Sequence, residues 1–292
     1  MNTAECLDTL LTQGHIPPDS EVVSTNNKLV VVSYDEQIVA RIGEIATEQV
    51  RDDPHDLGYS HGISWLISAI APVVKPLEEH MIRIENYVIS RYPLMNRRPE
   101  LSKTVEAYSM LALTGDSLLV ANNMSVRKLN IPGYLQERLS YMHGNEQYEQ
   151  RLVAQVQHIA DKMGSDFPFM ELSADNPALV HGDCKTDNVV SDYSGCLMLI
   201  DLDAAAIGPR QYDFASWRLR TEMGDTAPVE QIVDVARREN GWEEDTYRAL
   251  IGWKALSSMS FALRYGEPDA AIGSVNMVMN ASNVLGGFTN LS

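Results

Sequence analysis

One segment in the second half of the chain constrains it more than any other, because polar residues recur there in a fixed order between apolar runs. It begins with His181-Gly182-Asp183, and Asn188 follows five residues after the aspartate. Two short apolar runs, 189–190 and 197–200, flank a polar turn, and Asp201 comes directly after the second run. This order predicts a loop, a short β-hairpin and a second loop, with acidic side chains at the loop ends.

Carboxylates and an amide in such loops are the groups required to transfer a phosphoryl group from a metal-bound nucleotide. One carboxylate must accept the proton of the attacking hydroxyl group, while an amide oxygen and a second carboxylate hold Mg²⁺ against the phosphates. A single Asp in a turn carries little weight, because Asp side chains commonly bond to the turn backbone. The whole set, in one order, indicates phosphoryl transfer.

These residues resemble the catalytic core of the aminoglycoside phosphotransferase and choline kinase-like family, which are small-molecule relatives of the protein kinases. The family pattern is matched at His181, Gly182, Asp183, Asn188, Asp201, Gly208 and Asp213. The resemblance implies that Asp183 is the catalytic base and that Asn188 and Asp201 are the metal ligands. It also implies that His181 and Asp213 brace the catalytic loop.

Two further residues in this segment are assigned roles. Lys185 lies two residues after Asp183, where small-molecule kinases often have His. An ammonium group at that position can meet the transferring phosphate as a point charge, so we assign it a catalytic role. Asp203, two residues after Asp201, is a candidate ligand for a second metal ion.

The resemblance implies a two-lobed, protein-kinase-like α/β (α+β) fold. We expect a small antiparallel-sheet lobe over residues 1–93, which binds nucleotide, and a larger, mostly helical lobe over residues 94–292, which carries catalysis and acceptor binding. The residue pattern agrees with this division. A helix is expected at 4–13 and strands from 21, then at 28–33, 38–42, 71–74 and 83–89. Helical spacing recurs at 101–113, 148–163, 212–223, 227–239 and 244–265.

Three parts of the N-terminal lobe are predicted to contact the nucleotide. The polar tip Ser24-Thr25-Asn26 falls where the family has a phosphate-covering loop, although any hairpin tip has a similar composition. Arg41 occupies the strand position where kinases place a phosphate-binding Lys, and its guanidinium offers a bidentate fork. A solvent-facing strand Arg is an equal alternative. The run 88–93 resembles the interlobe hinge, so Ser90 and Tyr92 are assigned to the adenine site.

The acidic partner of this basic residue is the largest departure from the kinase pattern. Kinases hold the basic side chain with a Glu on the following helix, which is expected here over 56–69. The matching positions fall near Ser60 or His61, and neither residue is acidic. Nearby alternatives, among which the sequence does not choose, are Glu48, Asp52 and Asp56.

The net charge of the chain indicates which kinds of molecule it attracts. A formal net charge of −17 disfavours nucleic acid and anionic membranes and attracts cations. Acidic residues after the catalytic segment are candidates for binding a cationic acceptor, although charged residues are more often simply solvated. They are Glu222, Asp225, Glu243, Glu244, Asp245, Glu267 and Asp269.

The sequence also predicts a cytoplasmic location. Its 3 cysteines show no disulfide framework, which favours a reducing compartment. The N-terminus lacks the pattern of a secretory leader. The longest apolar stretch, 63–74, is interrupted by polar residues and is too short to span a bilayer.

We therefore expect a Mg²⁺-dependent phosphotransferase that moves the γ-phosphoryl group of ATP or GTP to a hydroxyl group of a small molecule. The acceptor is expected to be cationic, such as an aminoglycoside-like or other antibiotic. A kinase of a choline-like amine or a sugar is one alternative. A catalytically silent nucleotide-binding protein of the same fold is another, and a nucleotidyl transferase has no positive support.

Overall fold

The computed structural model describes residues 3–24, 29–44, 57–84, 87–95, 107–108, 110–111, 126–146, 148–175, 177–222, 244–265 and 273. The chain forms two compact units. The first comprises Met1–Ala107 and Thr186–Ala205, and the second comprises Tyr108–Lys185 and Ala206–Ser292. The chain therefore crosses between units inside the predicted catalytic segment. The predicted lobe boundary after residue 93 stays a prediction.

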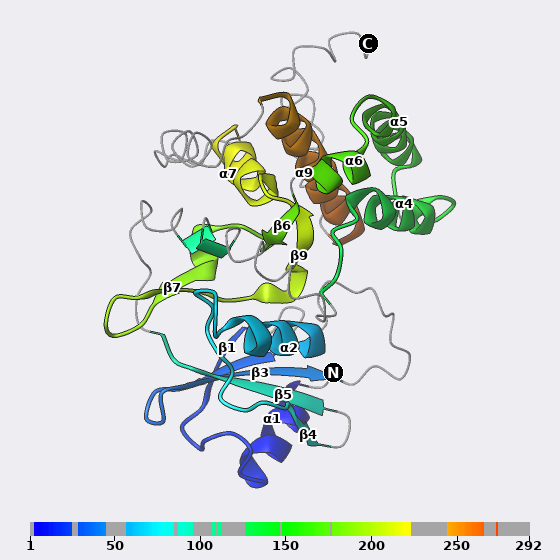
Figure 1. Ribbon diagram of the computed structural model, residues 1–292. Helices are drawn as coiled ribbons and strands as arrows, with labels where there is room; N and C mark the ends of the chain where they lie inside the picture. The colour runs from blue at the N-terminus through cyan, green and yellow to red at the C-terminus, as the bar shows by residue number, and fades with distance from the viewer. Residues whose placement is uncertain are drawn as a thin grey trace. The chain divides into compact units, whose positions relative to one another are not determined.

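A five-stranded antiparallel sheet is the framework of the first unit, with strand order β1-β2-β3-β5-β4 (Figure 1). Its strands are β1 (Glu21–Ser24), β2 (Leu29–Ser33), β3 (Ile38–Glu44), β4 (Ile82–Ile84) and β5 (Tyr87–Pro93). The predicted meander at 28–33 and 38–42 is confirmed, since β2 and β3 pair in register from Leu29↔Ile42 to Ser33↔Ile38.

The sheet is stabilised by an apolar core on the side where helix α1 (Thr3–Thr12) packs. Ile42 of β3 and Ile89 of β5 are direct cross-strand partners, and both side chains are fully buried. Leu10 of α1 belongs to the same buried cluster. The alternation of apolar and polar residues along β3 places these side chains on one face of the sheet.

Two predicted strands are corrected by the structure. Residues 71–74 form a single bridge, Val73 with Leu199, instead of a strand. Pro72 has no N–H to donate to a ladder, which limits pairing there. The predicted strand at 83–89 is split between β4 and β5, which pair with each other as adjacent antiparallel strands.

The first unit also contains helix α2 and a hairpin from the later part of the sequence. Helix α2 covers Leu57–Ile67. The hairpin consists of β7 (Val189–Ser191) and β8 (Leu197–Leu199), preceded by the short 3₁₀ helix η1 (Thr186–Asn188). A second 3₁₀ turn, η2 (Leu202–Ala204), follows Asp201.

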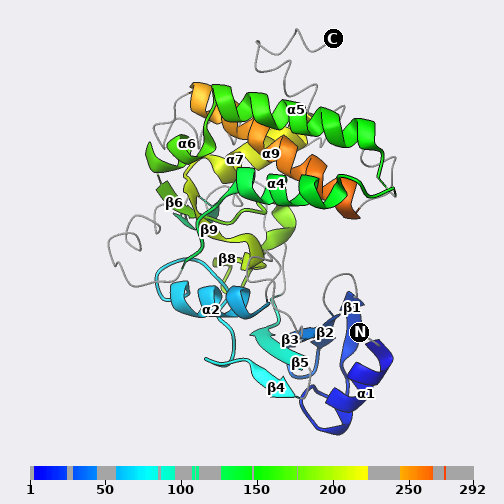
Figure 2. The ribbon, with the colours of Figure 1, turned by 90° about the vertical axis from the view of Figure 1, so that its right-hand side faces the viewer.

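The second unit is mostly helical in its described part. It contains α4 (Ile131–Met142), α5 (Gln150–Asp166), α6 (Phe169–Asp175), α7 (Tyr212–Glu222) and α9 (Glu244–Tyr265). Figure 2 shows α4 and α5 beside α9, in agreement with the packing of α9 on α4, α5 and α7. Two antiparallel strands, β6 (Pro177–Val180) and β9 (Ala206–Pro209), lead into and out of the predicted catalytic segment.

The helical pattern of the sequence predicted three of the five described helices of this unit, and it missed α4 and α6. The helices expected at 148–163, 212–223 and 244–265 are confirmed as α5, α7 and α9. The helix expected at 227–239 and most of that at 101–113 lie outside the described residues. No helix in the described part of the chain is long and apolar enough to cross a membrane.

The buried Ile42–Ile89 pair gives a test of the sheet core. We expect Ile42→Ala and Ile89→Ala each to lower the free energy of unfolding by about 2–5 kcal/mol, since each leaves a cavity that the sheet cannot close. Chemical denaturation followed by circular dichroism measures this loss. Val22→Ala on the exposed face of β1 is the control, and equal small losses in all three variants would contradict this core.

Candidate active site

The β7–β8 hairpin brings the two predicted metal ligands together. Val189 pairs with Leu199, and at the open end of the hairpin the N–H of Ile200 donates to the carbonyl of Asn188 over 3.0 Å. Asn188 is therefore opposite the residue that precedes Asp201. The backbone of Asp201 is left-handed (φ 64°, ψ 53°), a conformation that Asp tolerates better than most residues. At Asp201 the chain turns away from the direction of β8, and η2 begins at the next residue.

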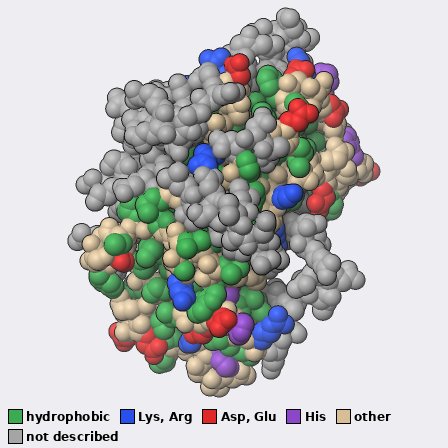
Figure 3. All heavy atoms as spheres, in the orientation of Figure 1, with side chains coloured by type: hydrophobic (Ala, Val, Ile, Leu, Met, Phe, Trp, Pro, Cys, Tyr) green, Lys and Arg blue, Asp and Glu red, His purple; other side chains and the backbone are tan. Residues whose placement is uncertain are grey.

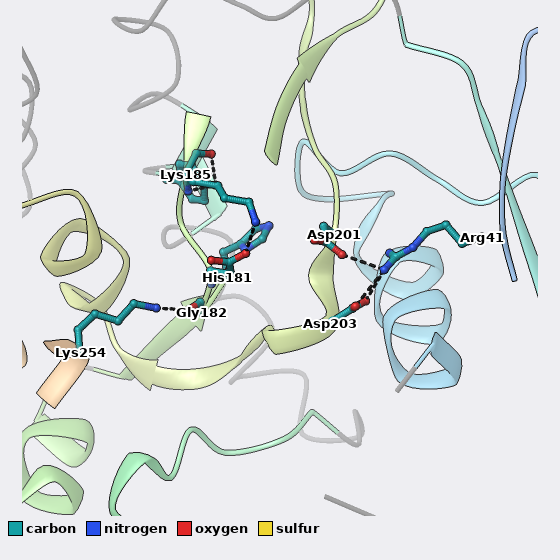
Figure 4. A network of polar contacts seen from close by, with 9 residues as sticks. Arg41, His181, Gly182, Lys185, Asp201, Asp203 and Lys254 are labelled. Carbon is teal, nitrogen blue, oxygen red and sulfur yellow. Dashed lines mark hydrogen bonds and ion pairs between the residues drawn. The ribbon is translucent and has the colours of Figure 1, made fainter. Parts of the chain in front are cut away.

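Arg41 on β3 is bonded to two carboxylates within the first unit (Figure 4). Its Nη2 donates to Asp201 Oδ1 over 2.9 Å. The same nitrogen donates to both oxygens of Asp203, at 3.1 and 2.9 Å. The Arg41 side chain is only 14% exposed. Burial lowers its pKa, but the charges of Asp203 and Asp201 outweigh this and leave the pKa raised. Arg41 is thus a charged, paired residue and not a solvent-facing one.

A buried carboxylate organises the loop that carries Asp183 in the second unit. Asp213, at the start of α7, accepts hydrogen bonds from the N–H groups of His181 (2.7 Å) and Gly182 (2.9 Å). Burial raises the pKa of Asp213, and the charge of His181 and these two N–H groups oppose that rise. Gly182 has φ 81°, a conformation that favours glycine. The ring of His181 packs edge-on against Tyr108.

Asp183 forms an ion pair with Lys185, and the Nζ of Lys185 lies 2.6 Å from Oδ2 of Asp183. Burial alone would raise the pKa of Asp183. The hydrogen bond from Lys185 and the charges of Lys254, Lys185 and His181 lower the pKa to about 2. The carboxylate is therefore ionised at neutral pH, and 43% of its side chain is exposed.

Lys254 and Tyr108 are site residues that the sequence reasoning missed. Lys254, on α9, donates to the carbonyl of Gly182 over 2.8 Å, and its ammonium lies 5.3 Å from the ring centre of Tyr212. The Tyr108 hydroxyl donates to the carbonyl of Lys185 and accepts from its N–H. The sequence offers one weak signal for Lys254, a single Lys within the apolar stripe of 244–265, and it does not indicate the partner.

The predicted nucleotide contacts are placed as follows. Thr25 and Asn26 lie outside the described residues, and Ser24 is the last residue of β1. Ser90 and Tyr92 belong to β5, where they pair with Arg41 and Val39 of β3.

The prediction of an exposed hinge at 88–93 is therefore wrong. Its β-branched and aromatic residues extend the sheet, and β5 pairs with β3 along its whole length. Ser90 is fully buried and its hydroxyl lies 2.7 Å from Nδ1 of His61. Nucleotide contact by Ser90 or Tyr92 stays a prediction.

Two residues of α2 occupy the helix positions at which kinases carry the acidic partner of the basic residue. Ser60 of α2 is the matching residue, with its Oγ 3.5 Å from Nη1 of Arg41. His61 is turned to Ser90 and to the carbonyl of Glu79. The alternatives Glu48, Asp52 and Asp56 lie outside the described residues.

The residues at the open end of the hairpin suit Mg²⁺ as a ligand set. A carboxylate and an amide oxygen are hard oxygen donors, and Mg²⁺ is usually held by one or two protein groups with waters and substrate phosphates. Asp201 keeps 37% of its side chain exposed, whereas Asn188 is almost fully buried. No cluster of three or more His, Cys, Asp or Glu side chains that could hold a metal occurs among the described residues.

Most of the acidic residues proposed for acceptor binding cannot be placed. Asp245 is exposed on the first turn of α9, and Glu222 and Glu244 are the end residues of α7 and α9. The others lie outside the described residues: Asp225, Glu243, Glu267 and Asp269.

Comparison with known proteins finds a family model that matches part of the chain. Residues 129–250 match the model of the phosphotransferase enzyme family. The predicted family is confirmed. The predicted enzyme class is confirmed with it at the level of a phosphotransferase. No curated protein sequence matches the chain.

Solved structures of phosphotransferases resemble the whole chain. Choline kinase LicA from Streptococcus pneumoniae is 12% identical, with a TM-score of 0.68 and coverage of 99% of this chain and 100% of that chain. The GDP and kanamycin complex of APH(2")-IIia is 14% identical, with a TM-score of 0.65 and coverage of 96% and 99%.

A third similar structure is a thermostable mutant of aminoglycoside phosphotransferase APH(4)-Ia in ternary complex with AMP-PNP and hygromycin B. It is 16% identical, with a TM-score of 0.65 and coverage of 99% of this chain and 100% of that chain. At these identities the likeness establishes the fold. The predicted two-lobed, protein-kinase-like α+β fold class is confirmed.

The lysines beside Asp183 give a direct test of the site electrostatics. Each ammonium favours the ionised carboxylate, so we expect Lys185→Met to raise the pKa of Asp183 from about 2 toward the ordinary value near 4, and Lys254→Met to raise it less. An NMR titration of the carboxyl carbon measures the pKa. Lys128→Met, at an exposed position in the same unit, is the control. An unchanged pKa in both site variants would contradict the ion-pair geometry.

Proposed function

We propose that this chain transfers the γ-phosphoryl group of ATP or GTP to a hydroxyl group of a small cationic molecule, with Mg²⁺ as cofactor. The observation that carries the proposal is the convergence of Asn188 and Asp201 at the open end of one hairpin, with Arg41 bonded to Asp201. An amide oxygen, a carboxylate and a guanidinium together suit a metal–triphosphate group. The family match and the fold support the same chemistry.

Asp183 is proposed to orient the acceptor hydroxyl and to take its proton. With a pKa of about 2 it is a weak base at neutral pH, because an efficient base has a pKa near the working pH. Such a carboxylate suits a loose phosphoryl-transfer transition state, in which the hydroxyl becomes acidic only as the new bond forms. Its main contribution is then the position of the hydroxyl oxygen, and proton transfer comes late.

Lys185, Arg41 and Mg²⁺ are each proposed to have a separate role. Lys185 holds Asp183 in the resting state and can turn to the transferring phosphate, because its ammonium is a flexible point charge. Arg41 binds the nucleotide phosphates from β3. Mg²⁺, held by Asn188 and Asp201, would neutralise the charge of the phosphate oxygens. Ser24, Thr25, Asn26, Ser90 and Tyr92 stay predicted contacts of the nucleotide.

An aminoglycoside-like antibiotic is the proposed acceptor, and resistance to such a compound the proposed consequence. The similar structures include complexes of other enzymes with kanamycin and hygromycin B. The net charge of −17 attracts cations in general. On the face drawn in Figure 3, however, acidic side chains are interspersed with Lys and Arg over the coloured residues. The attraction is therefore proposed to come from a local acceptor site and not from that whole face.

A choline-like amine is the second candidate acceptor, supported by the similarity to choline kinase LicA. A cytoplasmic location is proposed as well. It agrees with Cys184 and Cys196, which are both free thiols.

The first experiment is a nucleotide-consumption screen with Mg²⁺ against amino-sugar antibiotics, choline-like amines and neutral sugars. We expect turnover with a cationic acceptor, and the KM for that acceptor to rise with salt while the KM for nucleotide changes less, because salt screens the charge attraction. A neutral sugar with a salt-independent KM would refute the cationic acceptor and leave the kinase proposal standing. Nucleotide binding without any turnover would favour the silent-protein alternative.

The second experiment tests Asp183. We expect Asp183→Asn to lower kcat at least about 100-fold, the usual scale for loss of a general base, with nearly unchanged nucleotide affinity. Steady-state kinetics and calorimetry measure the two quantities. Asp161→Asn, at an exposed position on α5, is the charge-matched control. Turnover within a few-fold of the unmodified protein would rule out the base assignment.

A further inference from the structure

Helix α2 lacks the carboxylate that a phosphate-binding basic residue of this fold would be expected to use. Its sequence, LGYSHGISWLI, contains no Asp or Glu. The group that it presents to Arg41 is the hydroxyl of Ser60, at 3.5 Å from Nη1. A hydroxyl at the limit of hydrogen-bond distance offers no formal charge to a buried guanidinium. The compensating charge must come from another element.

That charge comes from η2, the short turn after Asp201. Asp203 directs both carboxylate oxygens to Nη2 of Arg41, at 3.1 and 2.9 Å, and only 10% of its side chain is exposed. Asp201 contacts the same nitrogen through Oδ1 and is considerably more exposed. The two carboxylates are therefore unequal, since one is buried against Arg41 and the other is open to solvent.

Helix α2 supports this arrangement indirectly. The hydroxyl of Tyr59 donates to the carbonyl of Ala205 over 2.7 Å, at the residue that ends η2. Inside the turn, the N–H of Ala205 donates to the carbonyl of Leu202, whose side chain is fully buried. The helix thus holds the turn, and the turn holds the arginine.

We propose that Asp203 is the positioning residue that anchors Arg41 in place of a helix carboxylate, which leaves Asp201 available to the metal. This inference rests on the proposed phosphotransferase function. It reassigns Asp203, which the sequence suggested as a ligand of a second metal ion. A carboxylate with both oxygens bonded to a guanidinium would have to leave Arg41 in order to bind a cation.

Removal of Asp203 should therefore act through Arg41. Among the described residues, the buried guanidinium would keep only Asp201 as a charged partner, so arginine and metal would compete for one carboxylate. An uncompensated buried charge is costly, and the arginine is expected to turn fully to Asp201. The result would be weaker binding of nucleotide with and without metal, and a higher Mg²⁺ concentration for half-maximal activity.

Calorimetry with ADP, in EDTA and in saturating Mg²⁺, tests the anchor. We expect Asp203→Asn to weaken ADP binding about tenfold or more in both conditions, the scale for a charge-assisted hydrogen bond, and Asp203→Glu to weaken it less. Asp201→Asn should weaken binding mainly in Mg²⁺. In an Arg41→Ala background, Asp203→Asn should change affinity less than about twofold, because the residue to be anchored is gone.

Two outcomes would overturn the proposal. A loss in Asp203→Asn that occurs only in Mg²⁺ would make Asp203 a metal ligand. A loss of equal size in the Arg41→Ala background would show that it acts independently of Arg41.

A protein that binds no nucleotide would refute the proposed function and not the anchor. A second measurement therefore tests the anchor without nucleotide. A double-mutant cycle on the free energy of unfolding should show a larger coupling of Arg41 with Asp203 than with Asp201. A larger coupling of Arg41 with Asp201 than with Asp203 would also contradict the proposal that Asp203 anchors Arg41.

Discussion

The charge on a nearly buried arginine is the constraint on which the candidate site depends. Arg41 lies on a central strand of the first unit and cannot be solvated as a surface residue would be, so carboxylates must balance it. Both come from a segment more than 150 residues later in the sequence. The ion pair therefore joins the early meander to the loop that carries a predicted metal ligand, and it fixes the predicted phosphate-binding group beside that ligand.

A second buried charge plays the corresponding part around Asp183. Asp213 accepts hydrogen bonds from two backbone N–H groups of the predicted catalytic loop, and Lys254 donates to the carbonyl of Gly182, which follows them. The loop backbone is thus held by charged groups from two helices, α7 and α9. The ionised state of Asp183 follows from the same geometry, because Lys185 and Lys254 are both near enough to stabilise its negative charge.

The sequence predicted those parts of the structure that follow from local patterns. Strands β2 and β3, helix α9 and the hairpin before Asp201 could all be foreseen, because each has its own periodicity and turn residues. The segment at 88–93 was misjudged, since a strand and an exposed hinge share the same β-branched composition and only the pairing with β3 distinguishes them. Lys254 could not be foreseen, because its contact with Gly182 depends on how α9 packs. The pairing of Arg41 with Asp203 likewise depends on tertiary contacts that no local pattern encodes.

The most direct test of this account is a crystal structure of the chain with Mg²⁺ and a non-hydrolysable ATP analogue. We expect the metal to be bound by the side-chain oxygens of Asn188 and Asp201, with Arg41 bonded both to a phosphate and to Asp203. A metal bound away from Asn188 and Asp201, or an Arg41 that contacts no phosphate, would contradict the account.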